Sequence, residues 1–499
     1  RRVLFRSGLF TSRIVLESLG IEDYGIYNLV GGIVTIFAFL NSAMIATSQR
    51  FISYELGKGN LHKLKDVFCT TLTIHIAIAF IIVVLSEVIG VWFLNTKLNI
   101  PSDRMMAANW TLQLSIFVFA VNVISVPYNA SIVAHEKMSA FAYISIFEVS
   151  LKLAIAYLLL FISYDKLIVY SILVFCVALL LRSLYCFYCK RHFEECHYTF
   201  SFNIEQFREM FAFAGWSLVG NLGFSFKDQL SNILLNLFFG TVVNAARGIS
   251  VQVGSLINSF SANFMMAMNP QITKSYAVGD LYRSKELVYA GCRFSFYLLA
   301  VISLPIMINI TYILNLWLVE VPQYTDIFLI LTIVCNLLYA ISSPLTTAMQ
   351  ATGRIKWFQV IICIVMLTEL PIAYLLLSIG YPPYSVLYAS LFVTLLGVLI
   401  RIVLISRILP IYEIRYYVTH IFSKNILIVF ITYCIAYILH KKMEQDSFFT
   451  AVLSSFILEL ILFSLAYLCG LSSTERYVVN QKLVTILESK RRKNKQKNI

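Results

Sequence analysis

The residues of this sequence that are best suited to binding or proton transfer are charged side chains deep inside long apolar stretches. A charged side chain near the centre of a bilayer costs ~2.5–3.5 kcal/mol, so it usually faces a partner or a wet cavity. A buried acid whose pKa rises toward the working range can gain and lose a proton. A Lys or Arg can replace the hydration of a phosphate with charge-assisted hydrogen bonds. The deepest charges are Glu148, Lys152, Lys227, Asp228, Glu369 and Glu459.

Two pairs of these charges are close in the sequence. Glu148 and Lys152 are four residues apart with the acid first, which is the favourable order for a pair on one helical face. Lys227 and Asp228 are adjacent, so protonation of the acid would leave the ammonium free for an anion. Either pair can equally be a permanent structural ion pair, because buried charges are commonly paired. Our ion-coupling candidates are therefore Asp228, which is the best placed, with Glu148 and Glu369.

The composition explains why these charges lie in apolar surroundings. Of 499 residues, 59% are hydrophobic and only 13% are charged, and 39 Lys and Arg against 26 Asp and Glu give a formal charge of +13. A soluble chain is typically about a quarter charged. The 10 cysteines lie mostly in apolar runs, which does not suit a disulfide framework. The composition excludes a disordered chain, a disulfide scaffold and a nucleic-acid-binding domain, and it indicates a polytopic membrane protein.

Apolar runs of ~20 residues, long enough for a membrane-spanning helix, recur along the whole chain. We expect an all-α protein with about fourteen spans, the first of them cut short. Cytoplasmic loops hold an excess of Lys and Arg. Most basic residues fall on the side of the loop 48–66 and of the tail after Arg476, so both termini are predicted to be cytoplasmic. The predicted spans are 3–18, 24–47, 67–94, 105–132, 138–163, 166–189, 211–237, 241–268, 288–318, 325–349, 355–379, 384–407, 423–440 and 448–470.

The two halves of the sequence match each other, as in many transport proteins built by duplication. A shift of 220 residues places Gly59 on Gly279, and a shift of 217 places Pro127 on Pro344. Each half holds six of the predicted spans, so the two copies should have the same topology and be related by an axis along the membrane normal. We predict that the two lobes superimpose in these registers.

This duplication divides the chain into lobes and additions. The second copy begins near 203–207, so we expect roughly one to two dozen further residues before residue 1, which is Arg and not Met. No signal-peptide pattern is present. The predicted divisions are a first lobe (1–189), a cytoplasmic inter-lobe loop (190–210), a second lobe (211–407), two added spans (423–470) and a basic cytoplasmic tail (471–499).

Three short motifs stand out in the first lobe. They are Leu19-Gly-Ile-Glu-Asp-Tyr-Gly-Ile-Tyr-Asn-Leu-Val-Gly-Gly32, then Asn41-Ser42 with Gln49-Arg50-Phe51, and then Glu55-Leu-Gly-Lys-Gly-Asn60. They resemble the polysaccharide flippases of the Wzx type, in the multidrug/oligosaccharidyl-lipid/polysaccharide (MOP) exporter superfamily, whose layout of spans is also similar. The resemblance implies a MATE-like pair of lobes around a central cavity, and export of a lipid-linked sugar by alternating access.

The same resemblance makes spans 1, 2, 7 and 8 the walls of the cavity and directs attention to their basic residues. Arg13, Arg50, Lys227 and Arg247 lie on these spans, and together with Lys152 they are our substrate-binding candidates. Lys227 is the deepest of the four. The other three lie near span ends, where snorkelling of the side chain into the headgroups is an equally good explanation.

Two further features are interpreted as structural. Arg182 and Arg401, near the inner ends of their spans, are expected to snorkel. A cluster of possible zinc ligands completes an apolar helix and enters a short loop, and we expect no metal there because such clusters give many false positives. The cluster consists of Cys186, Cys189, His192, Cys196 and His197.

These features predict a flippase that moves an undecaprenyl-diphosphate-linked oligosaccharide, a repeat unit of lipopolysaccharide or capsule, to the outer leaflet of a bacterial inner membrane. No cofactor is expected, since no phosphate-binding loop, HExxH or GxSxG motif occurs. The expected partners are this substrate, membrane lipids, and a polymerase and glycosyltransferases of the same pathway. One alternative is a cation-coupled multidrug antiporter of the same fold, which should prefer acids in its cavity. A membrane polysaccharide polymerase or ligase is less favoured, because the outer loops are short and we expect no enzyme.

Overall fold

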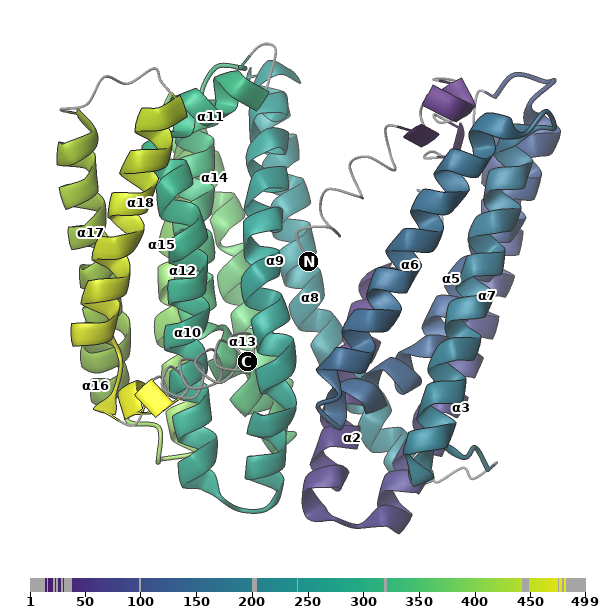
Figure 1. Cartoon of the computed structure of the whole chain (residues 1–499), viewed down its shortest axis with the longest axis horizontal. Coiled ribbons are helices and arrows are strands. Elements are labelled where there is room, and N and C mark those ends of the chain that lie inside the picture. Colours follow the sequence, from purple (N-terminus) through teal and green to yellow (C-terminus); the bar gives the residue numbers. More distant parts are fainter. Residues whose placement is uncertain are drawn as a thin grey trace, which may run out of the picture. The chain divides into compact units, whose positions relative to one another are not determined.

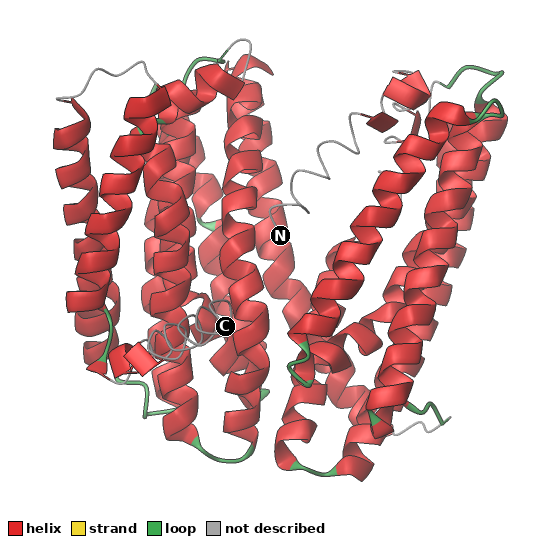
Figure 2. Ribbon diagram, in the orientation of Figure 1, coloured by secondary structure: helices red, strands yellow, loops and turns green. Residues whose placement is uncertain are grey.

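The computed structural model describes residues 14–481 except 16, 21–22, 24–25, 28–29, 31–37, 98–99, 200–203, 240, 318–320, 442–447, 474 and 478–479. These residues form helices joined by loops, and no strand occurs among them (Figure 2). Within this part of the chain, 10 helices are long and apolar enough to cross a membrane. The predicted all-α, multi-pass fold is therefore confirmed. Most of the predicted span 3–18 and much of 24–47 fall outside the described residues.

The chain folds into two compact units. The first comprises the residues up to Leu222 together with Thr273–Gly279, and the second comprises Gly223–Ile272 and the residues from Asp280 onward. Two long helices therefore contribute to both units, namely α8 (Ile204–Phe239) and α9 (Thr241–Ala277). α8 begins within the stretch 190–210 that we predicted to be a loop, because its first turns are polar and give no hydropathy signal.

The first unit is a set of long helices joined by short turns (Figure 1). Its α5 contacts α7, α3 and α2, so α5 lies at the centre of this unit. A π-helical segment, Ser86–Gly90, joins α3 to α4. The helices are α2 (Ala38–Lys58), α3 (Leu61–Leu85), α4 (Val91–Lys97), α5 (Met105–Ala134), α6 (Met138–Leu158) and α7 (Lys166–His192).

The second unit has its main apolar core where α10, α12, α15, α17 and α18 pack together. Its helices begin and end close to the predicted spans, and the differences lie mostly at polar ends that hydropathy does not detect. They are α10 (Leu281–Ile308), α11 (Ile310–Trp317), α12 (Thr325–Thr352), α13 (Lys356–Leu367), α14 (Glu369–Ser378), α15 (Ser385–Ile408), α16 (Ile414–Tyr416), α17 (Lys424–Lys441) and α18 (Phe448–Leu465), with a π-helical segment at Tyr417–Ser423.

Local backbone geometry supports both predicted repeat registers. Gly59 and Gly279 both have positive φ, +69° and +88°, at the turn before the next helix. The following residue caps that helix in each copy: the Asn60 side chain accepts from the Lys63 amide, and the Asp280 side chain accepts from the Arg283 amide. In the register with a shift of 217 residues, Glu136 and Gly353 both have positive φ. Pro127 lies inside α5, and Pro344 lies inside α12.

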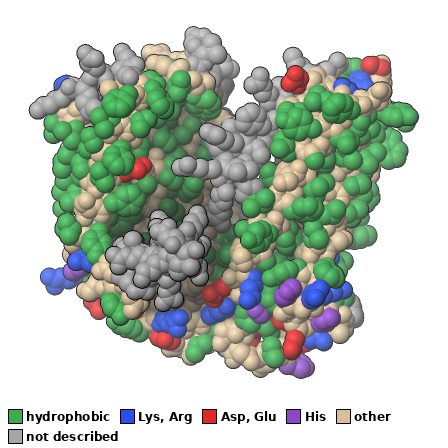
Figure 3. All heavy atoms as spheres, viewed as in Figure 1, with side chains coloured by type: hydrophobic (Ala, Val, Ile, Leu, Met, Phe, Trp, Pro, Cys, Tyr) green, Lys and Arg blue, Asp and Glu red, His purple; other side chains and the backbone are tan. Residues whose placement is uncertain are grey.

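An arginine connects three parts of the first unit. The Arg104 guanidinium forms an ion pair with Asp23 and donates to Asp165 Oδ2 at 2.8 Å. Asp165 also caps α7 by accepting from the amides of Leu167 and Ile168. The hydrogen bond to Asp23 raises the pKa of Arg104 above its usual value. In this unit the apolar side chains cover the sides of the helices, whereas Lys, Arg and His gather at one end (Figure 3).

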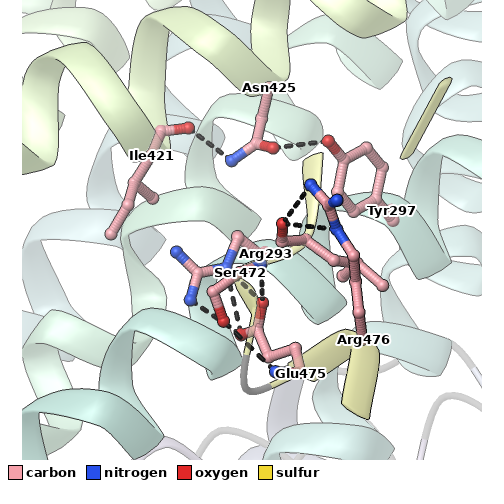
Figure 4. A network of polar contacts seen from close by, with 8 residues as sticks. Arg293, Tyr297, Ile421, Asn425, Ser472, Glu475 and Arg476 are labelled. Carbon is pink, nitrogen blue, oxygen red and sulfur yellow. Dashed lines mark hydrogen bonds and ion pairs between the residues drawn. The ribbon is translucent and has the colours of Figure 1, made fainter. Parts of the chain in front are cut away.

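A polar network anchors the segment after α18 to α10, and α10 in turn to α17 (Figure 4). The buried Arg293 donates to both carboxylate oxygens of Glu475, at 2.7–3.1 Å. Glu475 also accepts from the amide of Ser472, and one turn along α10 the Tyr297 hydroxyl donates to Asn425 of α17. This network fixes the start of the predicted tail against the second unit.

Candidate functional site

Four charged side chains of the second unit form one cluster. Lys227 Nζ of α8 lies 3.1 Å from Glu369 Oε2 and 3.4 Å from Asp228 Oδ1. Arg247 Nη2 of α9 lies 3.9 Å from the same Asp228 oxygen. The cluster contains two cations and two anions, so its formal charge is balanced. It brings together four of the residues that the sequence analysis singled out.

The members of the cluster differ in their access to water. Glu369 is fully buried and Lys227 is 12% exposed, whereas the Asp228 side chain is 59% exposed. Ser231, one helical turn after Lys227, donates to Glu369 Oε1 at 3.1 Å. Arg247 is buried and donates through Nε to Asn232 at 2.7 Å. Lys227 thus shares its charge between a buried acid and an exposed one.

A break between two helices positions the buried acid. α13 ends at Leu367 and α14 begins at Glu369, so the carboxylate lies in the first turn of α14. A carboxylate is stabilised there by the helix dipole. Pro371 follows two residues later and cannot donate to the preceding turn, which explains why the helix restarts at this point.

The cluster lines a cavity of about 360 Å³ inside the second unit. Lys227, Asp228 and Arg247 supply its charged part. The remaining wall combines neutral polar, aromatic and aliphatic side chains from α8, α9, α12, α13 and α15. These further lining residues include Phe224, Ser255, Asn258, Thr332, Cys335, Asn336, Tyr339, Ser390 and Thr394.

A larger cavity, of about 610 Å³, lies beside α10 and the segment after α18. Its basic residues Arg283, Lys285 and Arg293 are matched by three glutamates, and Arg293 is held by Glu475. Because its most buried cation already has a bidentate partner, this cavity has less capacity to bind an anion than the cluster around Lys227.

The remaining predicted residues lie in the first unit or outside the described residues. Glu148 and Lys152 form the predicted ion pair on α6, at 2.6 Å, and both are partly exposed. Arg50 of α2 places its guanidinium 4.4 Å from the ring centroid of Phe51 and 4.8 Å from that of Tyr54. Arg13 is outside the described residues.

Two expectations need correction. Arg401 does not snorkel, because it is 1% exposed within the second unit, and Arg182 donates at 2.5 Å to the Ile124 carbonyl inside the first. The partner expected for Lys227 was Asp228, and the structure adds Glu369 at a shorter distance. The shared depth of Lys227 and Glu369 was the signal in the sequence for this second partner.

The cysteine and histidine cluster at the end of α7 does not form a metal centre in the described residues. No group of three His, Cys, Asp or Glu side chains there has a metal-binding arrangement. A hydrogen bond with Cys189 and burial both favour the protonated thiol of Cys196 and raise its pKa far above its usual range. Zinc needs the thiolate, so this environment disfavours it as a ligand.

Comparisons with known proteins agree with this architecture. Residues 11–276 match the sequence pattern of the family described as polysaccharide biosynthesis protein, and residues 217–375 match the MatE pattern. No curated protein matched the sequence.

Several solved transporters share the fold at low identity. One is a MOP superfamily transporter from Pyrococcus furiosus, described as having a binding pocket of reverse polarity, with 13% identity, a TM-score of 0.67 and coverage of 82% of this chain and 92% of that chain. An outward-facing multidrug resistance MATE family transporter has 13% identity and a TM-score of 0.65, with coverage of 83% of this chain and 93% of that chain. The MATE transporter VcmN of Vibrio cholerae has 14% identity and a TM-score of 0.67, with coverage of 83% of this chain and 94% of that chain.

These structural matches show the fold, which is that of MOP superfamily transporters. The polysaccharide biosynthesis pattern covers more than half of the 499 residues. The chain therefore belongs to the polysaccharide biosynthesis protein family.

Proposed function

We propose that this protein is a flippase for an undecaprenyl-diphosphate-linked oligosaccharide and moves it to the outer leaflet by alternating access. The observation that carries the proposal is the pair of basic residues, Lys227 and Arg247, lining one cavity of the second unit. Diphosphate must lose water when it enters such a cavity, and these two side chains supply charge-assisted hydrogen bonds in its place. The lipid tail would remain in the bilayer while the head group crosses.

The neutral part of the cavity supports a sugar as the rest of the head group. Hydroxyl and amide side chains such as Asn258, Asn336, Ser390 and Thr394 line it beside the charged residues. Such groups both donate and accept hydrogen bonds, as sugar hydroxyls do. A cavity with a few placed polar groups and aromatic faces is the usual form of a small-molecule site.

The acids of the cluster supply a way to release the anion. While Glu369 and Asp228 are ionised, they compete with diphosphate for Lys227, and protonation of Asp228, the exposed acid, would weaken their hold on the ammonium. In vesicles holding the lipid-linked substrate, a proton gradient should accelerate flipping by wild type and not by Asp228→Asn. Equal rates for both proteins with and without the gradient would exclude coupling through Asp228.

We extend the proposal to the setting of the protein. The excess of basic residues on one side supports cytoplasmic termini, and we propose the inner membrane of a bacterium as the location. The polymerase and glycosyltransferases that consume and supply such a substrate would be its pathway partners. Lys152 and Arg50, in the first unit, and Arg13 remain candidates for contacts with the same head group.

A cysteine in the cavity provides a direct test. Cys335 lines the cavity with Lys227, so a bound ligand should slow its alkylation by N-ethylmaleimide, measured on its own peptide by mass spectrometry. Undecaprenyl diphosphate should protect Cys335, and the lipophilic cation tetraphenylphosphonium should not. Lys227→Ala should abolish the protection, whereas Lys227→Arg should keep part of it. Cys176, exposed on α7, is the internal control whose alkylation neither ligand should change.

The outcomes separate the two transporter classes. Protection of Cys335 by the lipid anion alone supports the flippase. Protection by tetraphenylphosphonium alone would favour the cation-coupled antiporter, in which Asp228 and Glu369 would bind the substrate. If neither ligand protects Cys335, this cavity is not the substrate site and the proposal is wrong.

A further inference from the structure

The two repeat copies use different side chains to donate to the backbone of their proline-containing helices. In the first unit, Pro127 of α5 has no amide hydrogen to donate to the carbonyl of Val123, and the next carbonyl along the helix is that of Ile124. Arg182 of α7 donates to this carbonyl at 2.5 Å, and its guanidinium lies 5.0 Å from the ring centroid of Tyr128. The arginine therefore supplies a side-chain donor to the backbone beside the proline, as side chains of neighbouring helices commonly do in membranes.

In the second unit, a different residue does this. Ile341, the counterpart of Ile124 in the repeat, precedes Pro344 by the same three residues. Its carbonyl accepts from the hydroxyl of Tyr417 at 2.9 Å. Tyr417 is fully buried and belongs to the π-helical segment before α17, which is outside the duplicated part of the chain. The added spans thus supply the hydrogen bond that an arginine supplies in the first unit.

Arg401 lies on α15, which is the last helix of the second copy as α7 is of the first, and it has another set of contacts. It is 1% exposed, and no carboxylate of the described residues lies within ion-pair distance of it. Its Nη1 donates to Ser342 Oγ at 3.1 Å, and its Nε has no hydrogen-bond partner. Its guanidinium carbon lies 5.3 Å from the ring centroid of Tyr339. Besides this hydrogen bond, the buried cation therefore contacts the face of an aromatic ring.

That ring belongs to the wall of the cavity that contains Lys227. Tyr339 is half-buried and lines the cavity, and Phe224, a second lining residue, meets it edge-on with 5.7 Å between the ring centroids. Arg401 and Phe224 together restrict the Tyr339 ring. A rigid aromatic face beside neutral polar groups suits the apolar C–H face of a sugar ring, whose hydroxyls would point to the polar groups around it.

We propose that Tyr339 is a specificity-determining residue that stacks on a sugar ring of the head group, and that Arg401 is the positioning residue that holds it. The inference rests on the proposed function, because it requires a sugar-bearing lipid in this cavity. It also gives a role to a cation that is buried without an acid. Tyr417 donates to the carbonyl beside Pro344, and Arg401 instead holds the Tyr339 ring in place.

The test is a competition between two lipids for the purified full-length protein, measured by native mass spectrometry. The lipids are undecaprenyl diphosphate and the same lipid carrying one N-acetylglucosamine. Wild type should prefer the sugar-bearing lipid by about two- to tenfold, the range that stacked ring pairs give. Tyr339→Ala should bring the ratio close to one, and Tyr339→Phe, which keeps the ring, should preserve it.

The positioning role is tested on both arginines. Arg401→Met removes the cation at similar length and should lower the lipid ratio, with Arg401→Lys restoring part of it. Arg182→Met is the matched control from the first unit and should leave the ratio at its wild-type value. If Arg401→Met does not fold, the Tyr339→Ala and Tyr339→Phe pair alone decides the inference.

The remaining outcomes distinguish two failures. Binding of neither lipid by wild type overturns the proposed function and this inference with it. Binding of both lipids with no preference in wild type, or with a preference that survives in Tyr339→Ala, overturns only the role of Tyr339. A preference lost equally in Arg401→Met and Arg182→Met shows a general structural effect and removes the positioning role.

Discussion

Replacing Glu369 with Gln tests whether the buried acid and a substrate anion compete for Lys227. Gln has the size of Glu and can still accept the hydrogen bond from Ser231, so the change removes the negative charge and little else. The carboxylate is fully buried and lies 3.1 Å from the ammonium. In the variant, Lys227 retains only the exposed Asp228, at 3.4 Å.

The expected loss of stability follows from these contacts. Removing one partner of a buried ion pair typically costs ~3–5 kcal/mol, because the other charge remains buried. Asp228 still neutralises part of the charge of Lys227 here, and the amide oxygen of Gln still faces it. We therefore expect Glu369→Gln to lower the free energy of unfolding by about 2 kcal/mol.

The expected effect on anion binding has the opposite sign. The charges of the cluster balance in wild type, and the variant carries one excess positive charge. We expect undecaprenyl diphosphate to bind about 1–2 kcal/mol more tightly, or roughly five- to thirtyfold. Release at the outer side should slow for the same reason, so flipping in vesicles should fall although affinity rises.

Thermal unfolding and lipid titration of the purified protein measure both effects. Glu148→Gln is the matched control, since it removes an acid from a partly exposed pair on α6 and should change stability by less than about 0.5 kcal/mol. An affinity for the lipid that stays unchanged or falls in Glu369→Gln would refute the competition between acid and substrate.

Three further changes test individual packing contacts within each of the two units. Arg104→Lys keeps the charge but cannot reach both aspartates that the guanidinium joins, so the free energy of unfolding should fall by about 1 kcal/mol, and an unchanged thermal midpoint would contradict this. Tyr417→Phe removes the hydroxyl from its carbonyl on α12 and should cost about 1 kcal/mol by the same measurement, while no cost would show that the carbonyl needs no donor. Gly57→Ala would place a Cβ 2.8 Å from the backbone of Lys274 and should cost ~1–3 kcal/mol. Gly215→Ala, which meets nothing within 4 Å, is its control and should stabilise or leave the protein unchanged.

The sequence was sufficient where a property depends on local geometry. Apolar runs locate the helices because a membrane requires about 20 apolar residues. The spacing of Glu148 and Lys152 predicts their ion pair because an α-helix places residues four apart on one face. The repeat register predicts equivalent turns, as the positive φ of Gly59 and Gly279 shows. These features need no knowledge of how one helix packs against another.

The sequence was insufficient where a partner comes from a distant helix. Lys227 has its sequence neighbour Asp228 at 3.4 Å and Glu369, from another helix, at 3.1 Å. The contact with Glu369 depends on how α8 and α14 are rotated about their axes, which hydropathy does not encode. Arg401 illustrates the same limit, because its position near the end of a span predicted snorkelling, whereas packing of α12, α15 and Tyr417 encloses it.

The repeat shows why equivalent positions acquired different roles. Lys152 and Glu369 occupy the same place in the two copies and carry opposite charges. Lys152 is paired within its own helix and is 48% exposed, so its charge is neutralised locally with little desolvation. Glu369 has no such local partner and is fully buried, so its charge depends on Lys227 of α8. Glu369 can lose its partner when a ligand attracts Lys227. The pair of Glu148 and Lys152 lies on one helix, so a ligand could attract Lys152 only by breaking that contact. The second copy is therefore the one in which ligand binding and an acid can be linked through a single lysine.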